Sequence, residues 1–337
     1  MNRLTGILLG TIMLSIASTA TTLAQNKVPA PKPAFADPVY DGAADPVIIW
    51  NKKKKAWWMF YTNRRANTND SSGVRWVHGT RIGIATSTDG STWQYMDTAN
   101  INYRPNEGYT FWAPDVIENK GLYHMYLTYV PGIFDDWNHT RNIVHLTSTD
   151  LQNWKYESTL KLANDHVIDA SVYRLPDGSW RLWYNNEKDG KSIYYADSKD
   201  LFHWEDKGKA IAARGEGPKV FRWKNSYWMI IDIWKGMDIY QSDDLLTWKR
   251  NANILEAPGR GNDDGAIGGH SDVVVNDGKA FVFYFTHPGR AKANRAPDQS
   301  LAARRSVIQV AELQLENGII TCDRDRPTYI QLKAVKK

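Results

Sequence analysis

The sequence predicts an all-β fold, a five-bladed β-propeller in which each blade is a short antiparallel sheet. Three observations support this prediction. Apolar residues at helical spacing are nearly absent after residue 24, aromatic strand-like segments recur along the chain, and an Asp-x-x-x-Trp motif repeats behind them. Repeated units of about 40 to 50 residues that each form one small sheet are typical of propellers.

The Asp-x-x-x-Trp motif occurs in four copies with one identical spacing. Its copies lie in ATSTDGSTWQY, LTSTDLQNWKY, ADSKDLFHWED and YQSDDLLTWKR, which pair Asp89 with Trp93, Asp150 with Trp154, Asp200 with Trp204 and Asp244 with Trp248. This regular recurrence indicates structural repeats and not unrelated turns.

Each copy of the motif follows an aromatic strand, and each aromatic strand follows a shorter strand that opens with an acid. The aromatic strands read AWWMFYT, LYHMYLTY, WRLWYNN and YWMIIDI, and AFVFYF at 280–285 is a fifth. The acid-led strands begin near Asp45, Asp115, Asp169, Glu216 and Asp272. Five such strands predict five blades. A β-sandwich is the alternative, but a sandwich has no reason to repeat these features in one order.

The chain divides into three predicted parts: a signal peptide (1–24), an N-terminal linker (25–38) and a single propeller catalytic domain (39–337). The signal peptide has a basic residue at Arg3, an apolar stretch over about residues 7–17 and a small-residue cleavage site ending at Ala24. We therefore expect a secreted or periplasmic protein. No later stretch approaches the ~20 apolar residues of a membrane span. The final RPTYIQL, residues 326–332, is expected to complete a blade with the chain's start.

Composition excludes several classes of partner and site. The net charge is +5, but the basic residues are dispersed apart from 51–55, which is expected to form a solvated turn, so no nucleic-acid partner is predicted. Cys322 is the single cysteine, which excludes an intramolecular disulfide and a cysteine-based zinc site. The 15 Trp and 17 Tyr residues suit the apolar faces of sugar rings, although aromatic side chains also fill β-rich cores.

The acids that open the innermost strands are expected to converge, because those strands line the central channel of a propeller. Burial and mutual repulsion raise the pKa of some carboxyls in such a group. A protonated acid beside an ionised acid is what glycoside hydrolysis requires. The acid-led strands therefore predict a glycosidase with a carbohydrate partner.

Five segments, one per blade, resemble glycoside hydrolase family 43: ADPV, FWAPDV, VIDASVY, GEGPKVF and GGHSDVV, over roughly residues 40–315. Families 32, 62 and 117 are more distant resemblances. The resemblance to family 43 implies an exo-acting, inverting enzyme that removes a terminal sugar from a plant or algal saccharide. It implies Asp45 as the general base, Glu216 as the general acid and Asp169 as the acid that tunes the pKa of the donor and orients it.

The resemblance also implies substrate contacts by Trp112, Asp115, His270 and Arg304, with Arg305 on the opposite face of the same expected strand. No cofactor is required, but His270 is also a candidate to hold a structural Ca²⁺ or Na⁺ in the channel through water. The oxygen-rich GNDDG at 261–265 lacks EF-hand spacing. A buried His270 satisfied by backbone, and an Asp115 that only shapes its strand, are the structural alternatives.

A long insertion at 63–83, NRRANTNDSSGVRWVHGTRIG, departs from the family pattern. Its cationic residues suit a carboxylate or sulfate on the sugar, and we assign Arg65 and His78 to substrate binding; a solvated loop is the alternative. The insertion leaves the sugar, its linkage and its anomer open. A family-117-like hydrolase of algal galactan fragments, a non-catalytic glycan-binding propeller and a phosphorolytic propeller enzyme are alternatives, and the oligomeric state is not predicted.

Overall fold

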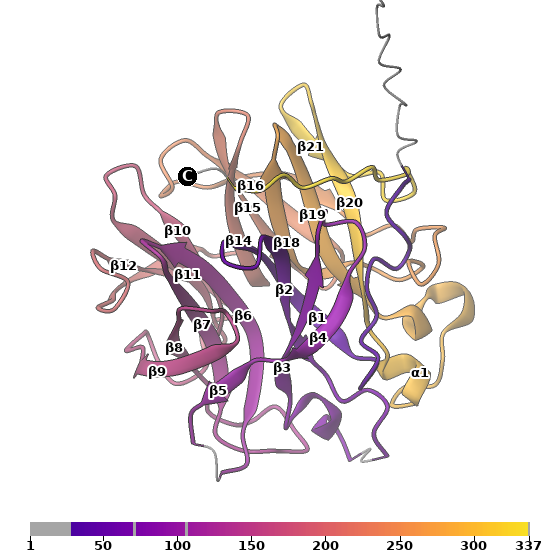
Figure 1. The fold of residues 1–337 in the computed structure, drawn as a ribbon, viewed down its shortest axis with the longest axis horizontal. Coiled ribbons are helices and arrows are strands. Elements are labelled where there is room, and N and C mark those ends of the chain that lie inside the picture. Colours follow the sequence, from indigo (N-terminus) through magenta and orange to yellow (C-terminus); the bar gives the residue numbers. More distant parts are fainter. Residues whose placement is uncertain (1–27, 70–71, 105–106, 336–337) are drawn as a thin grey trace, which may run out of the picture.

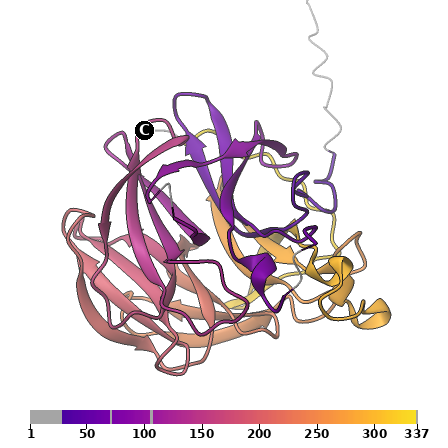
Figure 2. The ribbon, with the colours of Figure 1, turned by 90° about the horizontal axis from the view of Figure 1, so that it is seen from below.

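The computed structural model describes residues 28–69, 72–104 and 107–335 and confirms the predicted five-bladed β-propeller. Five small sheets form a ring in chain order, so that the last blade lies beside the first (Figures 1 and 2). The predicted signal peptide lies outside the described residues. Within those ranges, no helix has the length and apolar character needed to cross a membrane.

The strands of each blade follow one another from the centre of the ring outwards, and the innermost strands contact one another around the ring. Blade 1 contains β1 (Ala43–Asn51), β2 (Ala56–Asn63), β3 (Arg81–Ser87) and β4 (Gln94–Thr98). Blade 2 contains β6 (Thr110–Asn119), β7 (Leu122–Val130), β8 (Asn142–Ser148) and β9 (Asn153–Thr159), with β5 (Asn100–Asn102) added parallel to β9. Blade 3 contains β10 (Val167–Arg174), β11 (Trp180–Asn186), β12 (Ser192–Ser198) and β13 (Glu205–Ile211).

Blade 4 contains β14 (Glu216–Trp223), β15 (Ser226–Asp232), β16 (Met237–Ser242) and β17 (Lys249–Ile254). Blade 5 contains β18 (Gly269–Asn276), β19 (Lys279–Thr286), β20 (Val307–Glu316) and β21 (Ile319–Thr321). Among the described residues, the short helices lie in connections between strands: η1 (Arg75–Val77) between β2 and β3, and η2 (Pro288–Arg290), η3 (Lys292–Asn294) and α1 (Leu301–Arg304) between β19 and β20.

The aromatic second strands are buried on both faces, which explains their nearly continuous apolar sequence. On β2, Trp57 belongs to a buried cluster with Phe283 of blade 5, whereas the next residue, Trp58, belongs to a cluster with Met125 of blade 2. Successive side chains of a strand point to opposite faces, so one aromatic strand packs against both neighbouring blades. The core is therefore a set of layers between blades.

The Asp-x-x-x-Trp motif forms the turn between the third and fourth strands of blades 1 to 4. In blade 2, Asp150 Oδ1 accepts hydrogen bonds from the backbone N–H groups of Gln152 and Asn153, at 2.9 and 2.8 Å. Leu151 has a φ of 70°, and the indole N–H of Trp154 donates to its carbonyl at 3.0 Å. The repeat is thus explained by turn formation.

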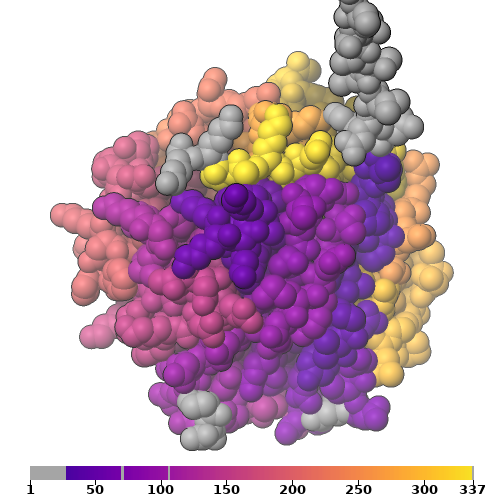
Figure 3. Space-filling view, in the orientation of Figure 1, coloured from indigo at the N-terminus to yellow at the C-terminus, as the bar shows by residue number. Residues whose placement is uncertain are grey.

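The two chain ends close the ring across blades 1 and 5. Phe35, in the range predicted as a linker, is buried and pairs with Ile308 of β20. The prediction that residues 326–332 complete a blade is wrong, because blade 5 ends with β21 and this segment forms no strand. It crosses blade 1 instead, as the yellow segment over indigo and purple residues in Figure 3 shows. The Leu332 N–H donates to the Asp89 carbonyl at 2.6 Å.

Every innermost strand has a β-bulge near its beginning, at the end of the strand that the acids occupy. The bulges lie between Ala44 and Val47, Trp112 and Asp115, Ile168 and Ser171, Glu216 and Lys219, and Gly269 and Ser271. A bulge turns one side chain away from its normal direction. Asp45, Ala113, Asp169 and Gly217 occupy these bulges with φ values of 52°, 43°, 60° and 57°.

The bulges free backbone N–H groups from the strand ladder, and in blades 2 to 5 one such group binds a side chain of the preceding blade. Such pairing avoids the cost of a buried, unsatisfied donor and fixes neighbouring blades to each other. The pairs are Ala113 N–H to Thr62 Oγ1 (2.8 Å), Asp169 N–H to Thr128 Oγ1 (3.1 Å), Gly217 N–H to Asp169 Oδ2 (3.0 Å) and His270 N–H to Asp232 Oδ2 (2.9 Å).

Candidate active site

Asp45, Asp169 and His270 occupy the bulges of β1, β10 and β18, which brings three blades to one point. His270 Nδ1 lies 3.6 Å from Asp45 Oδ1 and 4.0 Å from Asp169 Oδ2. The side chains of the two acids are only 7% exposed, and that of His270 is 15% exposed. The imidazole therefore stands between two nearly buried carboxyls.

Glu216 reaches the same group from blade 4, one residue before the bulge. Gly217 fills the bulge itself, and a Cβ at that position would lie 2.6 Å from the His270 ring, so only glycine fits beneath the imidazole. Glu216 Oε1 accepts a hydrogen bond from the indole N–H of Trp234 at 3.1 Å. The Glu216 side chain is 25% exposed and is thus more open to solvent than Asp45 or Asp169.

Two of these acids have a raised pKa. Burial, together with the charge of Asp45, raises the pKa of Asp169 to about 8. Burial and the charge of Asp169 raise the pKa of Glu216 to about 7, although the cation of Lys191, with its Nζ 3.7 Å from Oε2, acts in the opposite direction. Because the two carboxyls repel each other when both are ionised, the pair keeps near neutral pH a proton that exposed carboxyls would have lost.

Asp45 is in a different environment, because Arg64 of the insertion forms an ion pair with it. Arg64 Nη2 lies 3.1 and 3.3 Å from the two Asp45 oxygens. Arg64 Nη1 in turn lies 3.2 Å from Nε2 of His287, whose Nδ1 lies 2.9 Å from the Arg305 carbonyl. A carbonyl only accepts, so Nδ1 carries the proton and Nε2 accepts from Arg64. The neutral His287 therefore fixes the guanidinium that holds Asp45.

Asp232 is a further buried acid that the sequence analysis did not single out. It pairs directly with Glu216 across β14 and β15. Burial and the charge of Glu216 raise the pKa of Asp232 to about 7. Its oxygens accept hydrogen bonds from the backbone N–H groups of Trp234 (2.7 Å) and His270 (2.9 Å). Asp232 therefore helps to position Trp234, which contacts Glu216, and His270, which lies between Asp45 and Asp169. Its signal in the sequence is an acid at the end of an aromatic strand.

Asp115 lies deeper in the channel than the catalytic candidates, because it follows its bulge and does not occupy it. Lys219 Nζ lies 2.7 Å from Asp115 and 3.0 Å from Asp272. The second oxygens of the two acids accept the backbone N–H groups of Val172 and Ile48, at 2.7 Å each. Both carboxylates are thus already paired, and the five acid-led strands do not place their acids at one level.

Trp112 and His78 form part of an aromatic wall with Trp137. The His78 and Trp112 rings are 5.2 Å apart, and Trp137, which is 51% exposed, lies 5.9 Å from Trp112. Burial and the charge of Arg141 lower the pKa of His78 to about 4, so this histidine is neutral and does not attract an anion by charge. Arg65 Nη1 donates to the His78 carbonyl at 3.3 Å, which supports the wall from behind.

A chain of charged side chains connects this wall to Glu216. The guanidinium of Arg141 lies 5.8 Å from the Trp112 ring and forms a 2.6 Å ion pair with Glu187. Glu187 also pairs with Lys191 at 2.6 Å, and Lys191 reaches Glu216. The wall and the acid cluster therefore belong to one continuous region.

Arg304 does not join this region. It was expected on a strand, but it is the last residue of the short helix α1, because Ser300 caps the helix-forming sequence LAAR by accepting the Ala303 N–H. Its side chain is buried, and Nη1 lies 3.4 Å from the Thr68 carbonyl. Strand β20 begins only at Val307.

The GNDDG acids are neutralised by cations. Asp263 pairs with Arg305 at 2.7 Å, and the buried Asp264 pairs with Lys32 at 2.6 Å and with Arg324. In the part of the chain that the structure describes, no three His, Cys, Asp or Glu side chains are grouped so that they could hold a metal ion.

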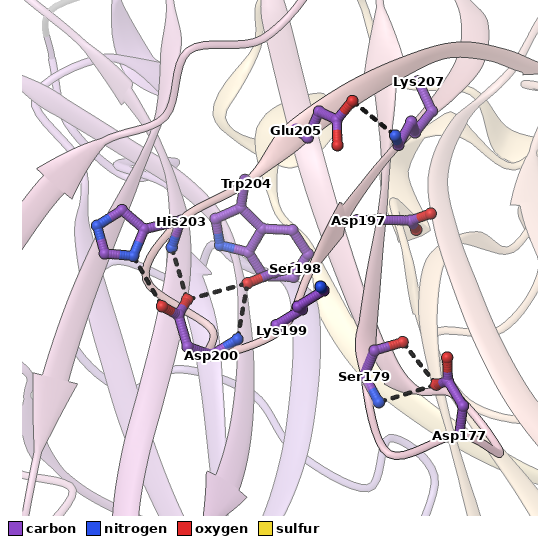
Figure 4. Close-up of a pocket in the computed structure, with 10 residues that line it drawn as sticks. All are labelled: Asp177, Ser179, Asp197, Ser198, Lys199, Asp200, His203, Trp204, Glu205 and Lys207. Atoms are coloured by element: carbon purple, nitrogen blue, oxygen red, sulfur yellow. Dashed lines mark hydrogen bonds and ion pairs between the residues drawn. The ribbon is translucent and has the colours of Figure 1, made fainter.

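A surface hollow of about 630 Å³ lies on blade 3, and none of the clustered acids lines it (Figure 4). It is lined by the turn motif of that blade, where Asp200 accepts hydrogen bonds from the backbone of Phe202 and His203 and pairs with the His203 ring at 2.7 Å. Its polar groups already serve the turn. The converging carboxyls, and not this hollow, therefore mark the candidate reactive site.

The acid cluster combines an ion-paired carboxylate, Asp45, with the coupled carboxyls of Asp169 and Glu216, which keep a proton near neutral pH. A protonated carboxyl beside an ionised one can give a proton to one atom of a substrate while the ionised one takes a proton from water. The protein is therefore a five-bladed propeller with an acid–base centre at one end of its central axis.

The chain matches no protein-family model and no curated protein by sequence. Solved structures of family-43 glycoside hydrolases share its fold. A thermostable family-43 enzyme is 18% identical, with a TM-score of 0.64 over 90% of this chain and 99% of that one. A family-43 β-1,3-galactosidase with galactodeoxynojirimycin is 17% identical, with a TM-score of 0.61 over 86% and 96%. A family-43 enzyme from Xanthomonas citri with xylotriose is 13% identical, with a TM-score of 0.60 over 86% and 92%. The resemblance to family 43 is thus confirmed for the fold.

Proposed function

We propose that this protein is a glycoside hydrolase that releases a terminal sugar from a plant or algal saccharide in one inverting step. Glu216 protonates the glycosidic oxygen as its bond to the anomeric carbon breaks. Asp45 takes a proton from the water that attacks the same carbon from the opposite face. Asp169 keeps the Glu216 proton in place and orients the donor.

The observation that carries this proposal is the difference between the environments of the two reacting acids. Asp45 is paired with the Arg64 guanidinium, which suits a base that must begin as an anion. Glu216 has a pKa raised to about 7, which suits a donor that must begin protonated. Glu216 is also the more exposed acid, as a group that must reach a substrate oxygen should be.

The structural neighbours support a carbohydrate substrate. They include a β-1,3-galactosidase, a β-xylosidase and an exo-1,5-α-L-arabinanase from a bovine ruminal metagenomic library. The names of these three neighbours give different sugars within one fold, so we propose that the sugar is decided by loops such as the insertion at 63–83. We further propose that residues 1–24 direct the protein to the periplasm or the exterior, where such saccharides are found.

The test is a screen of aryl glycosides and of plant and algal oligosaccharides with the wild-type protein, Asp45→Asn and Glu216→Gln. The anomer of the first product is followed by NMR. We expect a free terminal sugar of inverted configuration from the wild type and a loss of turnover in both variants. Wild-type turnover in either variant would refute the assignment of that residue.

The same screen separates the other candidate functions. Binding of a glycan, measured by calorimetry, with no product after long incubation would indicate a non-catalytic glycan-binding propeller. Turnover that requires added phosphate would indicate phosphorolysis. Activity restricted to red-algal galactan fragments would place the substrate among those of family 117.

A further inference from the structure

The connection between β19 and β20, residues 287–306, encloses a second hollow of about 260 Å³. The connection is compact. The Ala296 N–H donates to the Gly289 carbonyl at 2.7 Å, and Arg290 Nε donates to the Ala303 carbonyl at 2.8 Å. A Cβ on Gly289 would lie 2.2 Å from the Ala302 carbonyl oxygen, so this close approach requires glycine. The hollow is therefore formed by a folded loop.

Three arginines and one acid provide the charge of this hollow. Its lining consists of Arg290, Arg295, Asp298, Gln299, Ala303 and Arg304. Arg295 is paired with Asp298 at 2.8 Å at the exposed rim. Asp298 neutralises Arg295, so the remaining positive charge of the hollow belongs to Arg290 and Arg304.

Arg304 is the unusual member of the group, because it is only 1% exposed. Nη1 makes a long contact of 3.4 Å with the Thr68 carbonyl, and Nε and Nη2 have no hydrogen-bond partner among the described residues. A buried guanidinium with unsatisfied N–H groups is costly, and it presents donors in the fork geometry that matches an oxyanion.

Arg290 adds a second group of N–H donors, and other arginines lie near it. Burial and the charges of Arg64 and Arg295 lower the pKa of Arg290 to about 10, and the charge of Asp298 opposes this shift. Arg290 therefore remains a cation at neutral pH, and a bound anion would offset the repulsion among these arginines.

We propose that this hollow binds an oxyanion, held by Arg304 and Arg290. The chemistry is that of a sulfate or carboxylate group, supplied either by an acidic substituent of a saccharide or by a free inorganic anion. Arg64 connects the hollow to Asp45, since it contacts His287 at the start of the loop. If the anion is a substituent of a saccharide, this inference rests on the proposed function; if it is a free inorganic anion, it does not.

The first experiment measures anion binding without any turnover. Sodium sulfate is titrated calorimetrically into the protein at constant ionic strength, with sodium chloride as the reference salt. We expect saturable binding of sulfate by the wild type and affinity lower by about tenfold or more in Arg304→Gln and in Arg290→Gln, since each loses a charge-assisted hydrogen bond. The matched control is Arg222→Gln. Arg222 is exposed near the end of β14, and its variant should bind sulfate as the wild type does.

Two results would overturn the proposal: no saturable sulfate binding by the wild type, or wild-type affinity in both Arg290→Gln and Arg304→Gln. Arg290 lies at the surface and its guanidinium is only partly desolvated, so its variant keeps the test valid if Arg304→Gln does not fold. A second titration compares a sulfated or uronic-acid-bearing oligosaccharide with its neutral counterpart. Tighter binding of the acidic form that is lost in Arg290→Gln assigns the anion to the saccharide, and equal binding assigns it to a free ion. Neither result depends on glycosidase activity.

Discussion

The backbone N–H of Gly217 donates to Asp169 Oδ2 at 3.0 Å, and this contact joins the third and fourth blades at the acid cluster. It places the charge of Asp169 next to Glu216, the residue before Gly217, and it fixes the backbone from which Glu216 extends. One carboxyl thus both raises the pKa of Glu216 and determines its position. This coupling leads to predictions about the pH dependence of activity.

The activity of the wild type should fall as the pH rises above about 7. A general acid works only in its protonated form, and Glu216, with a pKa of about 7, loses its proton in this range. An ordinary glutamate would already be ionised two units lower. The measurement is kcat/KM between pH 5 and 9, and a profile that stays flat through pH 8 would contradict this role.

The Asp169→Asn substitution should move this alkaline limit to lower pH. The amide keeps an oxygen for the Gly217 N–H but cannot carry the negative charge that raises the pKa of Glu216. We also expect kcat to decrease by about 10²-fold or more, since the donor is less often protonated and less well oriented. Asp177→Asn, at an exposed turn of blade 3, is the control and should leave the profile unchanged.

The Arg64→Gln substitution should lower kcat by about 10²-fold, because Asp45 loses the ion pair that fixes its carboxylate. KM should change less, since Arg64 is committed to Asp45 and His287. Arg81→Gln is the matched control from the same insertion; Arg81 lies over the Tyr109 ring, 4.1 Å from its centre. Equal kinetic effects of the two substitutions would show that Arg64 has no special role.

The Lys219→Met substitution should lower the free energy of unfolding by about 3–5 kcal/mol, since it leaves Asp115 and Asp272 buried without a counter-charge. Burial alone would lower the pKa of Lys219, but the two carboxylates outweigh it and raise the pKa. Denaturant unfolding of this variant and of Lys224→Met, at an exposed turn, measures the difference. A loss below about 1 kcal/mol would argue against a structural ion triad.

Much of the fold follows from the repeats. The Asp-x-x-x-Trp motif is local, since its hydrogen bonds span only a few residues, and the aromatic strands require burial on both faces. Closure was predicted wrongly at residues 326–332, because their contacts with blade 1 join parts of the chain that are far apart in sequence. Local sequence patterns do not predict such long-range contacts.

The sequence predicted which acids form the candidate site, but not how deep in the central channel each acid lies. The bulges place Asp45 and Asp169 at one level and leave Asp115 one layer deeper, and a shift of one residue in a strand cannot be read from composition. Arg64 was visible only as one of several cations in the insertion. Its partner Asp45 is known only once the loop is folded.

The most direct measurement compares two glycosides of one sugar, with a phenyl and a dinitrophenyl leaving group, as substrates of the wild type and of Glu216→Gln. If Glu216 is the proton donor, kcat/KM of the variant should fall by about 10²–10⁴-fold for the phenyl glycoside, whose leaving oxygen needs the proton. It should fall by about tenfold or less for the dinitrophenyl glycoside, which leaves readily as an anion. Equal losses on both substrates, or no loss on either, would contradict the assignment of Glu216 as the general acid.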